Sequence, residues 1–224
     1  MIEFRNITKS YNNAIALNEI NLLIEKGEFI FLVGPSGAGK STFIKLLLKE
    51  IEPTEGEILI SGKNINNLTT RQIPFYRRKV GMVFQDYNLI PNLTVYENIA
   101  FAMKVTGARK SHIKKNVSKI LMKVGLSTKT KCFPNELSGG EQQRVALARA
   151  MISNPAIIIA DEPTGNLDPS MSKEIVELLI ELNKAGTTII MATHDKEIVN
   201  LLSKRVIEID NGKIIRDERR GNYK

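Results

Sequence analysis

Short apolar runs alternate along the chain with longer stretches in which apolar residues recur every three or four positions. Runs of five residues lie at 29–33, 156–160 and 188–192, a length typical of buried strands. Helical patterns lie at residues 43–48, after the first run, and at residues 172–184, between the other two. Buried strands separated by helices predict a parallel sheet with helices on both faces, which is an α/β fold.

The two ends of the chain carry an alternating pattern instead. Residues up to about Glu28 read as short strands, and Glu57 to Ile60 read as another strand after a turn. Near the other end, Asp210-Asn211-Gly212 separates residues 206–209 from residues 213–215, which predicts a hairpin. We expect the N-terminal segments to form an antiparallel β part beside the mostly parallel sheet.

A largely helical block interrupts the sheet. It spans residues from about 95 to 153 and follows a short apolar strand at residues 81–85. Within the block, apolar residues share one helical face and lysines share another: the first face holds Ile113, Val117, Ile120, Leu121 and Val124, and the second holds Lys115, Lys119 and Lys123. The block is therefore expected to form an inserted helical subdomain.

The turn after the first buried strand has the full G-x-x-x-x-G-K-S pattern, at residues 34–41. Such a turn points backbone N–H groups into a concavity that fits a phosphate. We expect Lys40 to reach the β- and γ-phosphates of a nucleotide and the Ser41 hydroxyl to bind Mg²⁺. An ordinary glycine-rich turn explains the glycines but not the Lys-Ser pair. The predicted nucleotide-binding residues here are Gly34, Pro35, Ser36, Gly37, Ala38, Gly39, Lys40, Ser41 and Thr42.

Two adjacent carboxylates, Asp161 and Glu162, follow the apolar run at residues 156–160. Ligands of open α/β sheets bind beyond the C-terminal ends of the strands, so this pair should emerge beside the phosphate loop. Asp161 is expected to help hold Mg²⁺, and Glu162 to polarise the water that attacks the γ-phosphate. Acidic strand ends are common, so the prediction depends on the phosphate loop upstream.

A second glycine-rich helix start occurs at Leu137-Ser138-Gly139-Gly140-Glu141. Ser138 and Glu141 have the spacing of a capping box, which needs no ligand. The paired glycines Gly139 and Gly140 also leave the helix N-terminus bare, so that an anion could bind its amides. Both interpretations stay open on the local pattern alone.

Leu137-Ser138-Gly139-Gly140-Glu141, followed by Gln142-Gln143-Arg144, resembles the signature motif of ATP-binding cassette (ABC) ATPases, and residues 2–216 resemble one nucleotide-binding domain of that family. The resemblance implies a P-loop NTPase core at about residues 2–85 and 155–216. It implies a helical subdomain at about 86–154, and it leaves residues 217–224 as a C-terminal tail. It also implies a head-to-tail homodimer, in which Ser138, Gly139, Gly140 and Glu141 of one copy close over the ATP held by the other.

Four further positions match the family pattern. The resemblance implies that Tyr11 stacks on adenine and that Gln85 contacts Mg²⁺ or the attacking water. It implies that Asp168 crosses the dimer interface and that His194 holds the γ-phosphate and orients Glu162. Catalysis is therefore expected to depend on Lys40, Gln85, Glu162 and His194, with Ser41, Gln85 and Asp161 as the metal ligands.

Within the family, residues 163–168 resemble a subgroup that includes FtsE-, LolD- and MacB-type cassettes, and residues 34–39, 77–81, 83–86 and 92–102 most resemble the FtsE-type cassettes of bacterial cell division. This subgroup resemblance implies an FtsX-like integral membrane protein as partner, and transmembrane activation of peptidoglycan hydrolysis as the output. An ATPase of a LolD- or MacB-type lipoprotein-release or export complex is the alternative. Soluble DNA- or ribosome-associated cassettes carry a long coiled coil or two tandem cassettes, and P-loop kinases and GTPases lack the second helix start.

The charge of the chain is concentrated in one place. The net charge is +8, and residues 104–131 contain nine Lys or Arg and no Asp or Glu. This segment is expected to be a solvated face or a contact for anionic lipid. Nucleic-acid binding is not expected, because aromatic residues do not interleave with the basic ones.

The remaining composition bears on location. No apolar stretch approaches the roughly 20 residues needed to cross a bilayer, and the first residues alternate like a strand rather than a signal peptide. The single Cys132 agrees with a reducing compartment. We expect the chain at the cytoplasmic face of a bacterial cell membrane, held there by its partner.

Overall fold

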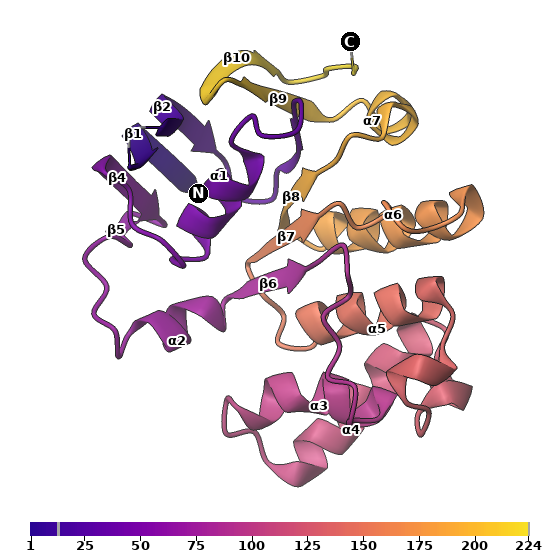
Figure 1. Cartoon of the computed structure of the whole chain (residues 1–224). Coiled ribbons are helices and arrows are strands. Elements are labelled where there is room, and N and C mark those ends of the chain that lie inside the picture. The colour runs from indigo at the N-terminus through magenta and orange to yellow at the C-terminus, as the bar shows by residue number, and fades with distance from the viewer. Residues whose placement is uncertain (13, 224) are drawn as a thin grey trace.

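The computed structural model describes residues 1–12 and 14–223, and its larger sheet carries the phosphate loop (Figure 1). Lys224, the last residue of the predicted tail, lies outside the described residues. The strand order is β10-β9-β3-β8-β7-β6. The strands are β3 (Phe29–Val33), β6 (Val80–Val83), β7 (Ile157–Asp161), β8 (Thr188–Ala192), β9 (Arg205–Asp210) and β10 (Lys213–Glu218). Every neighbouring pair is parallel except the β9–β10 hairpin, which confirms the mostly parallel α/β core.

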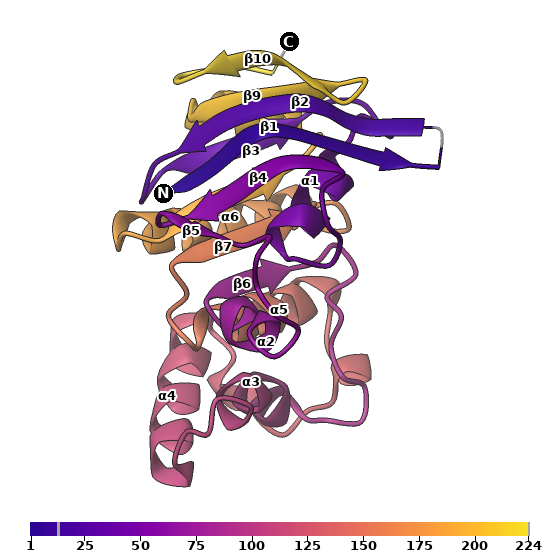
Figure 2. The same cartoon turned by 90° about the vertical axis from the view of Figure 1, so that its left-hand side faces the viewer.

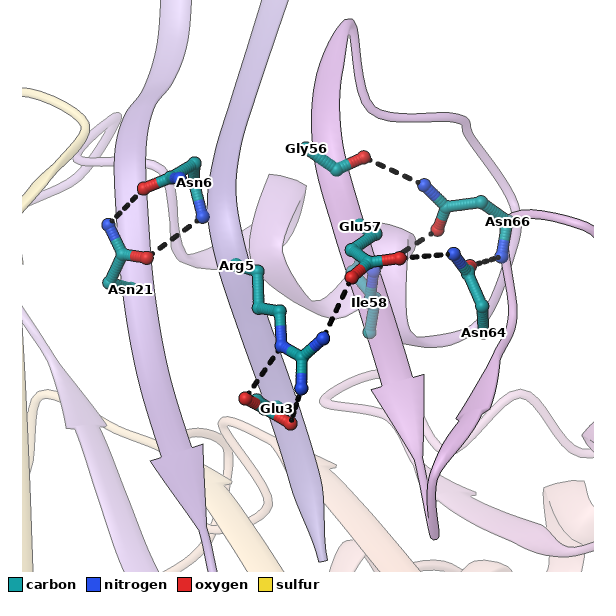
Figure 3. Close-up of polar contacts among 9 residues, drawn as sticks. All are labelled: Glu3, Arg5, Asn6, Asn21, Gly56, Glu57, Ile58, Asn64 and Asn66. Atoms are coloured by element: carbon teal, nitrogen blue, oxygen red, sulfur yellow. Dashed lines mark hydrogen bonds and ion pairs between the residues drawn. The ribbon is translucent and has the colours of Figure 1, made fainter.

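The smaller sheet is antiparallel, as predicted for the N-terminal part. Its order is β2-β1-β4-β5, with β1 (Ile2–Tyr11), β2 (Ala14–Ile24), β4 (Glu55–Ile60) and β5 (Lys63–Asn64). β1 and β2 are longer than the short strands that the sequence pattern predicts. Side-chain contacts cross three of the strands: Arg5 donates to Glu3 and to Glu57 on β4, and Asn21 on β2 bonds to Asn6 (Figure 3). These exposed polar contacts link neighbouring strands in register.

Alternating residues of the parallel strands supply two separate cores. Ile30 and Leu32 of β3 pack with helix α1 (Lys40–Leu47) and the antiparallel sheet. Phe29 and Phe31 point the other way, toward α5 (Gly139–Met151), α6 (Pro169–Lys184) and α7 (Lys196–Leu202). A strand with two buried faces reads as a continuous apolar run, which is why these strands lack an alternating pattern.

The helical block lies at the end of the molecule opposite β10 (Figure 2). It contains α3 (Val95–Lys104), α4 (Lys110–Lys123), two single turns at Ser127–Lys129 and Pro134–Glu136, and α5. Its core includes the predicted apolar face of α4, with Ile113, Val117 and Leu121 buried. Its proposed limits at residues 86 and 154 stay a prediction.

One short helix, α2 (Ile73–Arg77), was not expected from the sequence. It has five residues and begins at Ile73-Pro74, so it is too short to show an apolar repeat. Across residues 1–12 and 14–223, none of the helices is long and apolar enough to span a membrane.

Candidate functional site

The phosphate loop connects β3 to α1 through backbone conformations that favour glycine. Gly34 has φ 139°, and a Cβ there would lie 2.0 Å from the Ile209 carbonyl oxygen. Gly39 has φ 117° and precedes α1, where a Cβ would lie 2.6 Å from the Ala16 oxygen. Because Gly39 has no side chain, it cannot cap the first turn of α1, and the amides of that turn are left for another acceptor.

Lys40 is folded back onto the loop. Its Nζ donates to the carbonyl oxygens of Gly34 at 2.6 Å and Pro35 at 2.9 Å. The ammonium is therefore held at the mouth of the loop, where the oxygens of a bound phosphate could replace the two carbonyls.

A cavity of about 560 Å³ brings the loop together with three other predicted segments. Its lining residues are Ala16, Gly34, Pro35, Ser36, Gly37, Gly39, Lys40, Ser41, Thr42, Gln85, Asp161, Glu162, His194 and Tyr223. Ala38 of the predicted set is buried beneath the loop instead. Ala16 and Tyr223 were not expected from the sequence. The volume and the donor groups fit a nucleoside triphosphate.

Glu162 and His194 form the reactive pair of the cavity. Glu162 has φ 47°, a left-handed conformation that is strained for a side-chain-bearing residue, and its N–H donates to Ala192 at 2.9 Å. Its Oε2 lies 2.8 Å from Nδ1 of His194. The Glu162 side chain is 16% exposed and that of His194 70%. The pair thus holds a nearly buried carboxylate toward the cavity, where it can accept a proton from water.

Asp161 lies beside this pair at the end of β7. Its pKa is raised by burial and by the neighbouring Glu162, whereas Lys40 lowers it. Ser41, Gln85 and Asp161, whose side chains carry oxygen atoms, all line the cavity, and hard oxygen ligands suit Mg²⁺. A side chain on Gly165 would approach Gln85 Nε2 to 3.3 Å, so this glycine leaves room for the glutamine.

The second glycine-rich helix start is separate from this cavity. Ser138 Oγ accepts from the Glu141 N–H at 3.3 Å, and Glu141 Oε2 accepts from the Ser138 N–H at 2.9 Å. The hydrogen bond from the Ser138 backbone lowers the pKa of Glu141. The capping box of the sequence analysis is thus present at the start of α5.

Gly139 and Gly140 have a packing role that the sequence did not indicate. A Cβ on Gly139 would lie 2.8 Å from the Tyr87 hydroxyl, and one on Gly140 would lie 2.7 Å from Met171 Sδ. The two glycines let α5 approach the segment after Gln85 and helix α6.

Six other predicted binding residues, in three segments of the chain, are not brought into the cavity. Among the described residues that line it, none comes from residues 138–141. Asp168 caps α6 by accepting from the N–H groups of Ser170 and Met171, and these hydrogen bonds, with one from the Ser170 hydroxyl, lower its pKa. Tyr11 is 43% exposed, with Lys9 Nζ 5.1 Å from its ring centroid. Its adenine contact stays a prediction.

Two side chains of α5 connect it to the segments that carry the reactive residues. Arg149 donates to the carbonyl oxygens of Asn88 at 2.6 Å and Tyr87 at 2.9 Å, and burial lowers its pKa. Buried Gln143 donates to the Pro163 oxygen at 2.6 Å, one residue after Glu162. Sequence reasoning missed both contacts. The available signal was a charged Arg149 among the apolar residues of the second half of α5, whereas Gln143 lies among other polar residues and gave none.

Comparisons with known proteins agree with this geometry. Residues 17–165 match the family model described as ABC transporter. The cell division ATP-binding protein FtsE of Bacillus subtilis (strain 168) is 55% identical over 224 residues, covering all of this chain and 98% of that protein. FtsE of Mycobacterium tuberculosis (strain ATCC 25618 / H37Rv) is 50% identical over 225 residues, with coverage of 100% and 98%. FtsE of Escherichia coli (strain K12) is 45% identical over 213 residues, with coverage of 95% and 96%.

A solved structure has the same fold. It is a dimeric post-hydrolysis state of the ATP-binding cassette MJ0796 bound to ADP and Pi, with a TM-score of 0.90 and 37% identity. The match covers all of both chains.

Proposed function

Since the chain belongs to the ABC transporter family, we propose that it is an FtsE-type ATPase that works with an FtsX-like membrane protein in cell division. The chain is an ATPase of the ABC type, and its relatives from three bacteria carry the FtsE name over nearly their whole length. These relatives favour the FtsE-type assignment over the LolD- or MacB-type alternative. The proposed output is activation of peptidoglycan hydrolysis across the membrane.

The cavity residues divide the chemistry among themselves. The loop amides and Lys40 bind the β- and γ-phosphates, which fixes the terminal phosphoryl group in front of Glu162. Glu162 accepts a proton from the attacking water while the 2.8 Å contact with His194 holds its carboxylate in place. Gln85 orients the water on the other side. Mg²⁺, held by Ser41, Gln85 and Asp161, would neutralise charge on the phosphate oxygens.

Two copies are proposed to share each ATP. The support is that Ser138, the glycine pair after it and Asp168 lie outside the cavity of their own chain, where they can face another copy. The relative MJ0796 forms a dimer in its structure bound to ADP and Pi. Release of the γ-phosphate would remove the group that bridges the two chains and would open the dimer.

The Glu162–His194 contact inside the phosphate-loop cavity carries the catalytic proposal. Glu162→Gln should bind ATP with unchanged affinity and lose turnover by about a hundredfold or more, because the amide cannot accept the proton. The matched control is Glu177→Gln, an exposed carboxylate on α6. Full ATPase activity in Glu162→Gln would remove this residue from the role.

A groove between α2–β6 and the helical block is the proposed seat of the FtsX-like partner. Its volume is about 520 Å³, and it begins at Phe84 beside Gln85 and runs to Ala102 and Val105. Val105 lines it as an exposed apolar side chain, and the exposed Phe75 and Phe101 adjoin its lining residues Pro74 and Ala102 in the sequence. A helix of the partner bound in this groove would be displaced when Gln85 moves, because Phe84 lines the groove.

Phe101→Asp should therefore prevent co-purification with the FtsX-like protein from a membrane while the ATPase activity of the isolated chain stays unchanged. The control is Met122→Asp on α4, a side chain that is more exposed than Phe101 (74% against 46%) and belongs to a helix that contributes no lining residue to the groove. Equal capture of both variants would contradict the docking site.

Anionic lipid is the proposed second contact, through the basic residues 104–131. Lys123 pairs with Glu181 and Lys129 with Glu141, both at 3.3 Å. Within the described part of the chain, the other basic residues of this segment form no ion pair, so their charge is available to a headgroup. Flotation with anionic and neutral vesicles tests this: binding only to anionic vesicles, weakened by salt, supports it, and equal binding to both kinds or none contradicts it.

These contacts would place the chain at the cytoplasmic face of the membrane. The support is the FtsE name of its relatives together with the proposed groove, and nucleic acid is not among the expected partners.

A further inference from the structure

The C-terminal strap, residues 221–223, is fastened to the fold by three backbone hydrogen bonds. Gly221 N–H donates to the Lys204 oxygen at 3.1 Å, and Tyr223 N–H donates to Asn200 Oδ1 at 2.7 Å. Between them, Arg216 donates to the Asn222 oxygen at 2.6 Å. A Cβ on Gly221 would lie 2.8 Å from Val206 Cβ, so the strap lies directly against β9.

The side chain of Tyr223 extends from this strap into the nucleotide cavity. It lines the cavity together with Glu162 and His194 and packs against the core beneath α7. Lys196 Nζ lies 5.1 Å from its ring centroid. Burial and the nearby Glu208 and Glu162 raise the pKa of the phenol, which keeps the group neutral beside the reactive carboxylate.

The strap contacts α7 at two residues, Lys196 and Asn200, which lie two and six positions after His194. Helix α7 begins at Lys196, two residues after His194, and its first turns include Asn200. Only Ile198 and Val199 of this helix are buried, so it has a small apolar anchor of its own. The strap therefore supplies a substantial part of the contacts that fix α7 on the fold. Through the helix it also fixes the loop that carries the exposed His194 ring.

We propose that Tyr223 is a positioning residue for ATP hydrolysis, which clamps the start of α7 so that His194 keeps its contact with the Glu162 carboxylate. The proposal rests on the proposed ATPase mechanism and adds a part of the chain that the sequence motifs do not include. Tyr223 acts through the helix and the histidine, and the hydrogen bonds of its strap go to residues 200, 204 and 216 rather than to the phosphate loop.

The test compares Tyr223→Ala and Tyr223→Phe in the full chain. Tyr223→Ala should lower kcat about tenfold and change KM for ATP less than about twofold, because the loop that binds the phosphates is untouched. Tyr223→Phe should restore kcat, because the ring packing and the backbone hydrogen bonds remain. Arg219→Ala, an exposed residue before the strap, is the control.

Hydrogen exchange supplies a readout that does not depend on turnover. In Tyr223→Ala, amides of residues 193–199 should exchange faster while residues 34–47 keep wild-type protection. Unchanged exchange and kcat in Tyr223→Ala would overturn the proposal. So would faster exchange over the whole chain, or a Phe variant as slow as the Ala variant. Failure of the mechanism itself would show differently, as retained turnover in Glu162→Gln.

Discussion

Two helices of this molecule begin at glycine-rich turns, and the two beginnings are completed in different ways. The α1 turn has Gly39 before the helix, and its lysine rests on the carbonyls of its own loop. The α5 turn has Ser138 before the helix, and a full capping box satisfies two of its N–H groups. Only the α1 turn lines the cavity of the same chain.

Glycine spacing alone therefore does not predict whether a helix N-terminus binds a ligand or is capped by its own chain. At α1, the backbone amides depend on an acceptor from outside the helix, and the cavity provides room for a triphosphate. At α5, the capping box satisfies the N–H groups of Ser138 and Glu141, and the glycines also allow Tyr87 and Met171 to pack closely. A self-capped end is stable before it meets a ligand, which suits a surface that is presented to a second chain.

The largest effect is expected when Lys40, the cation at the α1 end, is removed. Lys40→Ala should lower ATP turnover by about a thousandfold and weaken ATP binding, because the charge that faces the β- and γ-phosphates is lost. Nucleotide titration and steady-state ATPase assays measure both. Lys45→Ala, on the exposed side of the same helix, should leave both values unchanged.

A substitution at the α5 end should lower turnover without weakening ATP binding. Ser138→Arg should leave ATP binding by the single chain unchanged and lower turnover by about a hundredfold, because the bulky cation prevents a second copy from closing over the nucleotide. Light scattering of the ATP-loaded Glu162→Gln protein, with and without Ser138→Arg, tests dimer formation. A drop in single-chain ATP affinity would place Ser138 in its own cavity and contradict the comparison.

The contact between α5 and the segment after Gln85 can be weakened at Arg149. Arg149→Ala leaves the carbonyls of Tyr87 and Asn88 without their donor, so the free energy of unfolding should fall by about 2 kcal/mol. Chemical denaturation measures this value. The exposed Arg71 provides the control substitution, and equal stability of the two alanine variants would show that Arg149 does not hold the segment after Gln85.

The smallest expected effect concerns the capping box and depends on pH. Because the folded-state pKa of Glu141 is lowered by the Ser138 N–H, its ionised form contributes stability above its unfolded-state pKa, and this is lost as the pH falls through the folded-state pKa. Glu141→Gln should therefore be less stable by about 0.5 kcal/mol at neutral pH. The difference from wild type should shrink as the pH falls below the ordinary pKa of a glutamate and vanish only below the lowered folded-state pKa of Glu141. A difference that is constant with pH would contradict this origin.

Much of the site was predictable because its signals are local. The Lys-Ser pair after the glycines, and the carboxylates after an apolar run, each identify a strand end from neighbouring residues alone. Parallel strands then bring these ends to one edge of the sheet. The position of His194 beside Glu162 follows from the same geometry, since β7 and β8 are neighbours.

What the sequence could not predict depends on contacts between distant segments. Ala16 and Tyr223 reach the cavity from opposite ends of the chain, and no local pattern records where either end will pack. Tyr11 illustrates the reverse case, because a family position lies outside the cavity lining in this structure. The strained φ of Glu162 was equally hidden, since it follows from the turn after β7 rather than from residue type.

The central claim is that one ATP is held by the α1 end of one chain and the α5 end of another. It can be tested by replacing the free Cys132 with serine and introducing Ser36→Cys and Ser138→Cys, two exposed positions, in the Glu162→Gln protein. A disulfide-linked dimer should form with ATP and not with ADP. A disulfide within a single chain, or a dimer yield that does not depend on ATP, would contradict it.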